Sequence, residues 1–306
     1  MNLEKYNFSG FIWGPANKYT DEILENINKT YPVLHYYTYE FSNKEIFSKS
    51  ILDIYTTDDI DPNKVKNVKI KNMINHSFCY TYFKFYIEKP NFRTKAMTGN
   101  NISHTVENIK KYVRTYYKGK VKNYIHDIII HISDNFEQTN AIDIIMKKYD
   151  KYIQHEFINL KYFLKSNYKN NIFDRADMFV RKYSIEQYLK NSDYDFSLYK
   201  KMQEKRTGKN AKDHITTFKD LINSIKNNGF NNNYPIRYSY NYLLRDGSHR
   251  LSYCYLKQKT FICIKAMEWD NHPTYSIDWF KKKNFSEKEL NIIDKELKQL
   301  LVFISS

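Results

Sequence analysis

The run Asp246-Gly247-Ser248-His249-Arg250 combines residue types that can bind and transfer phosphate groups. Gly247 allows an anion to approach the backbone closely, and Ser248 adds a hydroxyl donor. Arg250 can hold a phosphate through two parallel hydrogen bonds, and His249 can bind a phosphate or move a proton. Asp246 could orient a metal ion or a hydroxyl nucleophile. By itself, such a short run is more typical of a turn with a serine N-cap and a surface histidine.

The residues around this run predict a strand that gives way to the start of a helix. Residues 235–240 and 242–245 are two β-type runs separated by Asn241, and apolar residues from Leu251 onward recur on one helical face. The first N–H groups of a helix have no partner within the helix, and the helix dipole is positive at that end. We therefore expect the turn to form an anion site.

Four quoted segments carry a wider resemblance: a helix ending in LINSIKNNGF, the strand YPIRYSY, the strand and motif YLLRDGSHRLSYCYL, and the returning strand TFICIKAM. Together, residues 216–267 resemble the ParB/sulfiredoxin-like superfamily, in which a G-x-[HR]-R motif at a helix start binds nucleotide phosphates. The Asp-Gly-x-His-Arg version is similar to that of the free-serine kinases. Sulfiredoxins carry a cysteine where Ser248 stands, so we do not expect peroxiredoxin repair here. The second arginine-rich motif of chromosome-partitioning ParB proteins is not evident after residue 267.

The resemblance implies a role for each residue of the motif. It implies phosphate contacts for Gly247, Ser248, His249 and Arg250. Asp246 and His249 would be catalytic, and Asp246 would also bind the metal. We therefore expect a nucleotide-dependent phosphotransferase that phosphorylates the hydroxyl of a small molecule such as an amino acid or a sugar derivative. Its cofactors would be Mg²⁺ and a nucleoside di- or triphosphate, ATP before the others.

The resemblance also implies a glutamate base in the early part of this domain. Glu186, in the segment KYSIEQYLKNSDYDF, is the nearest candidate. Asp193, Asp195 and Glu204 compete with it, and all four also fit solvated acidic groups.

A possible second site lies in the first half of the chain. Residues 124–132 are almost continuously apolar or β-branched, which predicts a central strand buried on both faces. Asp127 and His131 would share one face of that strand, and Asp134 follows its end, where ligands of α/β sheets often bind. A buried, hydrogen-bonded histidine and a helix-capping Asp134 explain the same residues without a ligand. The polar loop 92–101, which carries two cations, could hold a further phosphate or could simply be solvated.

The order of the predicted elements indicates an α/β (α+β) fold in two domains. An α/β layered domain is expected over residues 1–150, and a ParB/sulfiredoxin-like nucleotide-binding domain over residues 176–306. Between them, residues 151–175 are rich in lysine and aromatic residues without strand alternation, which predicts a helical or polar linker. Within the first domain the patterns predict strands near 11–13, 33–41 and 78–88, a helix beginning with a Ser42–Glu45 capping box, and helices over 103–117 and 139–148.

Composition limits the classes of function. Among 306 residues, 42% are hydrophobic and 17% aromatic, which excludes collagen-like and ordinary disordered chains. The formal charge of +15 is compatible with a nucleic-acid partner, but Lys, Asn, Ile and Tyr are abundant together, as in A+T-rich coding sequences. The alternatives are therefore a ParB-like DNA-binding protein or nuclease, and a nucleotide-sensing module that regulates a catalytic N-terminal domain.

The spacing of Cys79, Cys254 and Cys263 suggests neither a disulfide framework nor a zinc ribbon. The first residues lack the pattern of a secretory signal, and no 18 apolar residues run together. We expect a cytoplasmic protein without a transmembrane segment that acts on a small molecule. The sequence makes no prediction about its oligomeric state.

Overall fold

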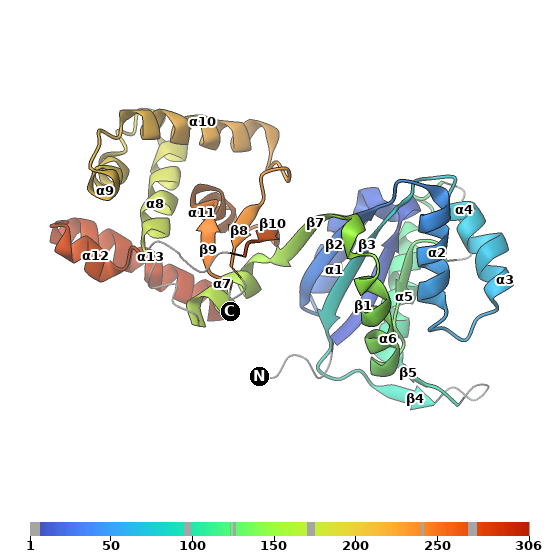
Figure 1. The fold of residues 1–306 in the computed structure, drawn as a ribbon. Helices are drawn as coiled ribbons and strands as arrows, with labels where there is room; N and C mark the ends of the chain where they lie inside the picture. Colours follow the sequence, from blue (N-terminus) through green and yellow to red (C-terminus); the bar gives the residue numbers. More distant parts are fainter. Residues whose placement is uncertain are drawn as a thin grey trace. The chain divides into compact units, whose positions relative to one another are not determined.

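Helices and strands are mixed throughout the computed structural model, so the fold class is α/β (Figure 1). The structure describes residues 7–94, 99–122, 124, 127–169, 175–239, 242–268 and 274–305. It divides into two units, Met1–Glu156 and Phe157–Ser306. Residues 151–175, predicted as a linker without strand character, contain a strand, β7 (Ile153–Asn159), followed by helix α7 (Leu160–Lys169).

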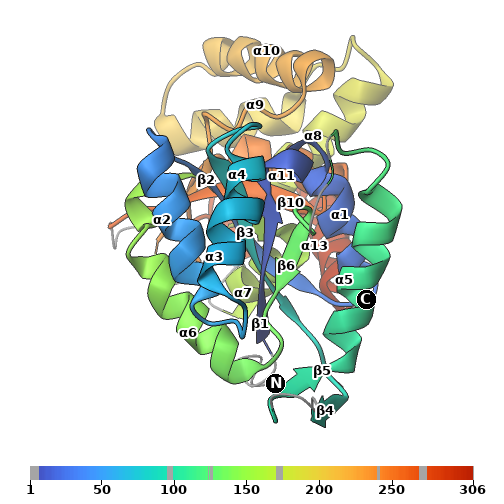
Figure 2. The same ribbon diagram turned by 90° about the vertical axis from the view of Figure 1, so that its right-hand side faces the viewer.

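The first unit is a sheet between two layers of helices. Its strands lie in the order β6-β1-β3-β2, with β3 antiparallel to β1 and β2 and β6 antiparallel to β1. Figure 2 shows α1 and α5 on one side of this sheet and α2 and α6 on the other. The elements are β1 (Asn7–Trp13), α1 (Thr20–Asn28), β2 (Val33–Glu40), α2 (Lys44–Tyr55), α3 (Pro62–Lys64), α4 (Lys71–Met73), β3 (Cys79–Tyr86), β4 (Phe92–Thr94), β5 (Asn101–Ser103), α5 (His104–Tyr117), β6 (Ile130–Ile132) and α6 (Phe136–Lys147).

Most of the predicted elements of this unit are confirmed, because their apolar periodicity matches the faces that they bury. On β1, Phe11 and Trp13 point to the layer of α2 and α6 and join one aromatic cluster there. One helix cap was predicted at the wrong residue. The side chain that accepts the hydrogen bond at the start of α2 belongs to Asn43, whose Oδ1 lies 2.9 Å from the Ile46 nitrogen, rather than to Ser42.

The prediction of a central strand over residues 124–132 is wrong in length and position. Strand β6 covers only Ile130–Ile132 and ends the strand order of this unit. It is nevertheless buried, because helix α5 covers its open edge. Lys110 Nζ donates to the carbonyl of Ile132 at 3.3 Å, and Arg114 Nη2 donates to the carbonyl of Ile130 at 3.0 Å. The continuous apolar run therefore indicates that both faces of the segment are buried. It does not indicate that a strand pairs with each of its edges.

In the second unit, helices surround a small sheet and the buried helix α8. Strand β8 is parallel to β10 and antiparallel to β9. Helix α8 packs against α11 and α13, and most of its residues are buried. The elements that follow α7 are α8 (Asp177–Lys190), α9 (Ser197–Thr207), α10 (Lys212–Asn228), β8 (Ile236–Tyr238), β9 (Leu244–Asp246), α11 (Ser248–Leu256), β10 (Phe261–Ala266), α12 (Ile277–Lys282) and α13 (Glu287–Ser305).

The two strands, the helix and the returning strand predicted around the Asp246–Arg250 motif are confirmed as β8, β9, α11 and β10, although the strands are shorter than expected. Tyr240 and Asn241, at the predicted turn, lie outside the described residues. All three cysteines are free thiols. None of the described helices is long and apolar enough to cross a membrane.

Gly10 tests the packing of the first unit. A Cβ atom there would lie 2.3 Å from Cζ of Phe83, its fully buried cross-strand neighbour. We expect Gly10→Ala to lower the free energy of unfolding by about 1–3 kcal/mol, because the buried ring of Phe83 or the strand must shift to make room for the added atom. Gly119→Ala is the control, since nothing lies within 4 Å of the added atom. Urea denaturation of both variants measures the difference. Equal free energies of unfolding for the two variants would contradict this packing.

Candidate functional site

The turn at which an anion site was predicted lies where β9 meets α11. Asp246 ends the strand, and Gly247 precedes the helix with φ of 87°, a left-handed conformation that favours glycine. A Cβ atom at Gly247 would also lie 3.2 Å from the Cα of Ile236. The Gly247 nitrogen donates to Oδ1 of Asp246 at 2.6 Å, which holds the turn closed.

The first turn of α11 has free backbone donors. Among the described residues, none accepts a hydrogen bond from the backbone nitrogens of Ser248, His249 and Arg250. Gly247 adds no side chain that would cover them. The turn therefore offers three N–H groups at the positive end of a helix, which is the arrangement that binds phosphate groups in proteins.

Two side chains of the motif are already engaged within the protein. Arg250 donates through Nη1 to the carbonyl of Tyr234, and its Nη2 lies 3.4 Å from Oδ2 of Asp246. Ser248 Oγ accepts a hydrogen bond from Nη2 of Arg175 at 2.7 Å. A phosphate bound here would meet side chains whose positions are already fixed.

His249 is held by aromatic neighbours rather than exposed on the surface. Its Nε2 lies 2.9 Å from the hydroxyl of Tyr199, and its ring centroid lies 4.5 Å from that of Phe218. Burial lowers the pKa of His249 well below its ordinary value, and Arg181 lowers it further. The imidazole is therefore neutral near pH 7 and offers hydrogen bonding, not positive charge.

A buried ionic cluster lies directly behind Ser248. The carboxylate of Asp177 is fully buried and lies 3.0 Å from Nε of Arg175 and 2.5 Å from Nη1 of Arg181. Two guanidinium groups thus share one carboxylate, and Nε of Arg181 has no hydrogen-bond partner among the described residues. The cluster leaves excess positive charge beside the turn. Sequence reasoning missed these residues, although charged residues within the mostly apolar run 175–181 were a signal.

Glu186 does not join the predicted site. Its two carboxylate oxygens lie 3.2 Å from Nζ of Lys182 and 2.7 Å from Nζ of Lys190. The hydrogen bond from Lys190 lowers the pKa of Glu186, which weakens it as a base. Within the described chain, no contact connects Glu186 with Asp246 or His249.

The competing acids show no clearer role. The carboxylate of Asp195 accepts a hydrogen bond from the Ser197 nitrogen at 2.9 Å, next to the start of α9. Asp193 is exposed and Glu204 is half-buried.

Asp246 is the carboxylate that the structure offers for a metal ion at this turn. Its side chain is exposed, with one oxygen bound to the Gly247 nitrogen. Among the described residues, no group of three His, Cys, Asp or Glu side chains is placed to hold a metal ion alone. Because Mg²⁺ in nucleotide sites is usually held by one or two carboxylates together with the phosphates, a single Asp246 fits that use.

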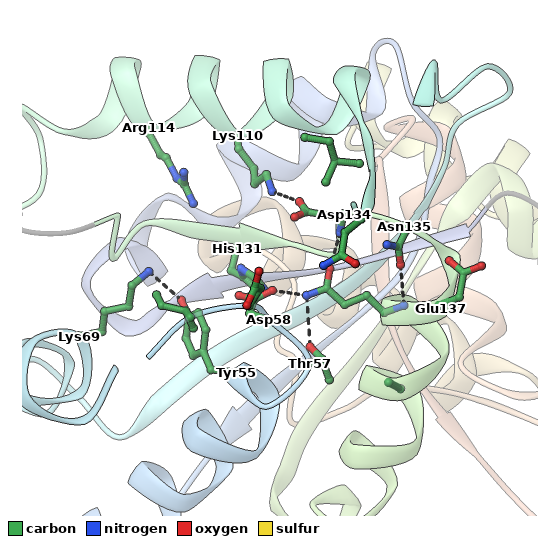
Figure 3. A pocket seen from close by; sticks show the side chains of 16 residues that line it. Tyr55, Thr57, Asp58, Lys69, Lys110, Arg114, His131, Asp134, Asn135 and Glu137 are labelled. Carbon is green, nitrogen blue, oxygen red and sulfur yellow. Dashed lines mark hydrogen bonds and ion pairs between the residues drawn. The ribbon is translucent and has the colours of Figure 1, made fainter. Parts of the chain in front are cut away.

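The first unit contains a polar cavity of about 440 Å³ beside the end of β6 (Figure 3). His131 and Asp134, two of the three residues of the predicted second site, line it. Asp127 instead lines a neighbouring cavity of about 820 Å³. The 440 Å³ cavity is lined by Tyr55, Thr57, Asp58, Asp59, Ile60, Lys69, Asn100, Ile102, Lys110, Arg114, His131, Asp134, Asn135, Glu137, Gln138 and Ala141.

Two expectations about this region are wrong. Asp127 precedes β6 with φ of 61°, so it does not share a strand face with His131, and its Oδ2 lies 3.2 Å from Nη1 of Arg114. Asp134 does not cap α6, because the side chain of Asn135 does so. The carboxylate of Asp134 is instead 2.5 Å from Nζ of Lys110. The sequence contained one signal for the cavity. Lys110 and Arg114 are four residues apart in α5, so they lie on one face of that helix.

The loop 92–101 is not a free cationic loop in the part that the structure describes. Nη2 of Arg93 lies 2.7 Å from Oε2 of Glu107, which neutralises it. The second cation, Lys95, lies outside the described residues.

Comparison of the chain with protein-family models, with curated proteins and with solved structures found no match. The resemblance of residues 216–267 to the ParB/sulfiredoxin-like superfamily therefore stays a prediction.

The ionic cluster behind Ser248 makes the stability of the second unit depend on pH. Burial disfavours the charged form of Asp177, but Arg175 and Arg181 outweigh burial and hold its pKa below the ordinary value. At pH 7 we expect Asp177→Asn to lose about 3–5 kcal/mol of unfolding free energy, because two buried guanidinium groups lose their counter-ion.

The sign of the pH effect follows from the lowered pKa. The stabilisation is present above the ordinary pKa of Asp, about 3.9, and is lost as pH falls towards the folded-state value. The difference between wild type and variant should therefore shrink below about pH 4. Urea unfolding across this pH range measures it, with Asp278→Asn at an exposed position as the control. Equal stability of the two variants at pH 7 would show that the cluster contributes nothing.

Proposed function

We propose that the protein is a nucleotide-dependent phosphotransferase whose second unit binds the nucleotide phosphates at the turn between β9 and α11. The observation that carries this proposal is the combination of Gly247 in a left-handed conformation with three backbone donors that no described residue satisfies. A phosphate can approach such a turn closely and accept all three hydrogen bonds.

The charges around the turn support the same assignment. Arg175, Arg181 and Asp177 together leave one excess positive charge next to Ser248. Phosphoryl transfer depends mainly on positioning and on stabilising negative charge, so a rigid cationic cluster beside the phosphates is suited to it. The reaction would transfer a phosphoryl group from ATP or a related nucleotide to the hydroxyl of a small molecule in the cytoplasm.

The residues have distinct roles in this proposal. Gly247 and the first turn of α11 hold the phosphates, and Ser248 and Arg250 orient them from the sides. Asp246 would hold Mg²⁺ together with the phosphates, and the ion would neutralise part of their charge. His249, which is neutral and fixed by Tyr199, positions the first turn and can donate or accept one hydrogen bond. The contacts of Glu186 give no support for its use as the base.

A nucleotide thermal-shift experiment tests the proposal. ATP, ADP and CTP, each with and without Mg²⁺, should raise the melting temperature, because a ligand present at 100 times its Kd stabilises the native state by about 2.7 kcal/mol. Gly247→Ala should abolish the shift, because the added methyl group would lie 3.2 Å from the Cα of Ile236 and 3.3 Å from Nη2 of Arg250, which displaces the turn. Gly208→Ala should retain it.

The control is matched because Gly208, in the same unit, also has a left-handed φ of 68° and has nothing within 4 Å of an added Cβ. Both alanine variants therefore carry the same type of backbone strain. The proposal fails if no nucleotide shifts the melting temperature, or if the two variants respond alike. A shift produced by duplex DNA but by no nucleotide would favour the DNA-binding alternative.

A further inference from the structure

Lys69, in the first unit, is a buried cation that has no ion pair with a carboxylate among the described residues. It lies in the π-helical turn Val65–Ile70 and is 8% exposed. Its Nζ is 3.3 Å from the hydroxyl of Tyr55 and 4.9 Å from the centre of that ring. No Asp or Glu among the described residues lies within ion-pair distance of it. Asp127 and Asp58 act on it from beyond that distance and raise its pKa, but burial and Arg114 outweigh them. A buried ammonium group without a carboxylate in direct contact is costly, which points to a missing anion.

Other basic groups converge on the same space. Figure 3 shows Lys110 and Arg114 reaching from α5 towards the cavity, Lys69 reaching in from another side, and His131 between them. Burial lowers the pKa of His131 well below its ordinary value, and Lys110, Lys69 and Arg114 each lower it further. Burial also lowers the pKa of Lys69, and Arg114 adds to that effect. Asp134 partly offsets this lowering at His131, and Asp127 and Asp58 partly offset it at Lys69, but the pKa of both groups stays lowered.

Two of the four carboxylates that line the cavity have partners in its wall. Asp134 pairs with Lys110 at 2.5 Å. Asp58 accepts a hydrogen bond from the amide of Gln138 and lies 3.7 Å from Nε2 of His131, beyond hydrogen-bond distance. His131 is 6% exposed, and its Nε2 has no hydrogen-bond partner among the described residues. Within the described residues, the cavity thus presents a histidine nitrogen without a hydrogen bond and an ammonium group without an ion-pair partner.

We propose that this cavity binds a phosphate monoester of a small hydroxyl-bearing molecule, with the phosphate between Lys69, Arg114 and His131. A phosphate dianion supplies the missing negative charge and can accept hydrogen bonds from all three groups, whereas a carboxylate carries half that charge. The rest of the wall includes the neutral polar groups of Thr57, Asn100, Asn135 and Gln138, which suit hydroxyl groups. The volume of about 440 Å³ accommodates a sugar phosphate.

Calorimetric titration of the full chain tests this proposal with inorganic phosphate, ribose 5-phosphate and ribose. Ribose 5-phosphate should bind more tightly than inorganic phosphate, and ribose should not bind measurably. Lys69→Met should weaken the binding of both phosphates at least about tenfold, because it removes the unpaired charge. Lys66→Met should leave binding unchanged, since Lys66 is an exposed lysine of the same π-helical turn.

Folding and binding effects can be separated. Lys69→Met removes a buried charge without a counter-ion, so its melting temperature should equal or exceed that of the wild type. His131→Gln is a second variant that should weaken phosphate binding through a different element. The proposal is overturned if neither phosphate compound binds the wild type at millimolar concentrations, or if Lys69→Met binds them as the wild type does.

This site is independent of the proposed nucleotide site. Gly247→Ala should leave the titration with ribose 5-phosphate unchanged, and Lys69→Met should leave the nucleotide-induced thermal shift unchanged. Failure of the nucleotide experiment would therefore not affect this result. If Lys69→Met abolished the nucleotide shift while Gly247→Ala retained it, the nucleotide would bind in this cavity, and the assignment to Gly247 would be wrong.

Discussion

A charged side chain that is buried away from water needs an opposite charge beside it. Both candidate sites lie where buried cations have too little negative charge around them. In the second unit, Arg175 and Arg181 share the carboxylate of Asp177. In the first unit, the described residues place only the hydroxyl and ring of Tyr55 against the ammonium group of Lys69. Hydrogen bonds and aromatic faces reduce the cost of such cations but do not remove it. An anion from solution would complete either cluster.

The elements of the fold could largely be predicted because their signals are local. The alternation in β3 and the periodicity of α5 each describe the face that a single element buries. The edge position of β6 could not be predicted in this way. Its apolar run reflects burial beneath α5, and a sequence pattern reports how much of a segment is buried, not which element covers it.

In the candidate sites too, the features that depend on neighbouring residues were predicted, and those that depend on tertiary contacts were not. The turn at Gly247 was predictable, because glycine, a strand end and a helix start are adjacent in the sequence. The partner of Ser248, Arg175, lies more than 70 residues away in the chain and reaches it only through tertiary packing. Lys69 was missed because a π-helical turn shifts the phase of the pattern on which helix prediction depends. Glu186 was predicted from its position in the chain, whereas Lys182 and Lys190, four residues before and after it, were a local signal for ion pairs on one helical face.

The contacts between α5 and β6 also bear on association between chains. A strand at the end of a sheet exposes carbonyl groups that can pair with a strand from another molecule, and proteins often protect such edges with charged side chains. Here the protecting groups are Lys110 and Arg114, which bond to the carbonyls of Ile132 and Ile130. The cations that face the cavity thus also cover a short, very apolar strand that would otherwise be a template for aggregation. Selection for solubility alone would preserve them.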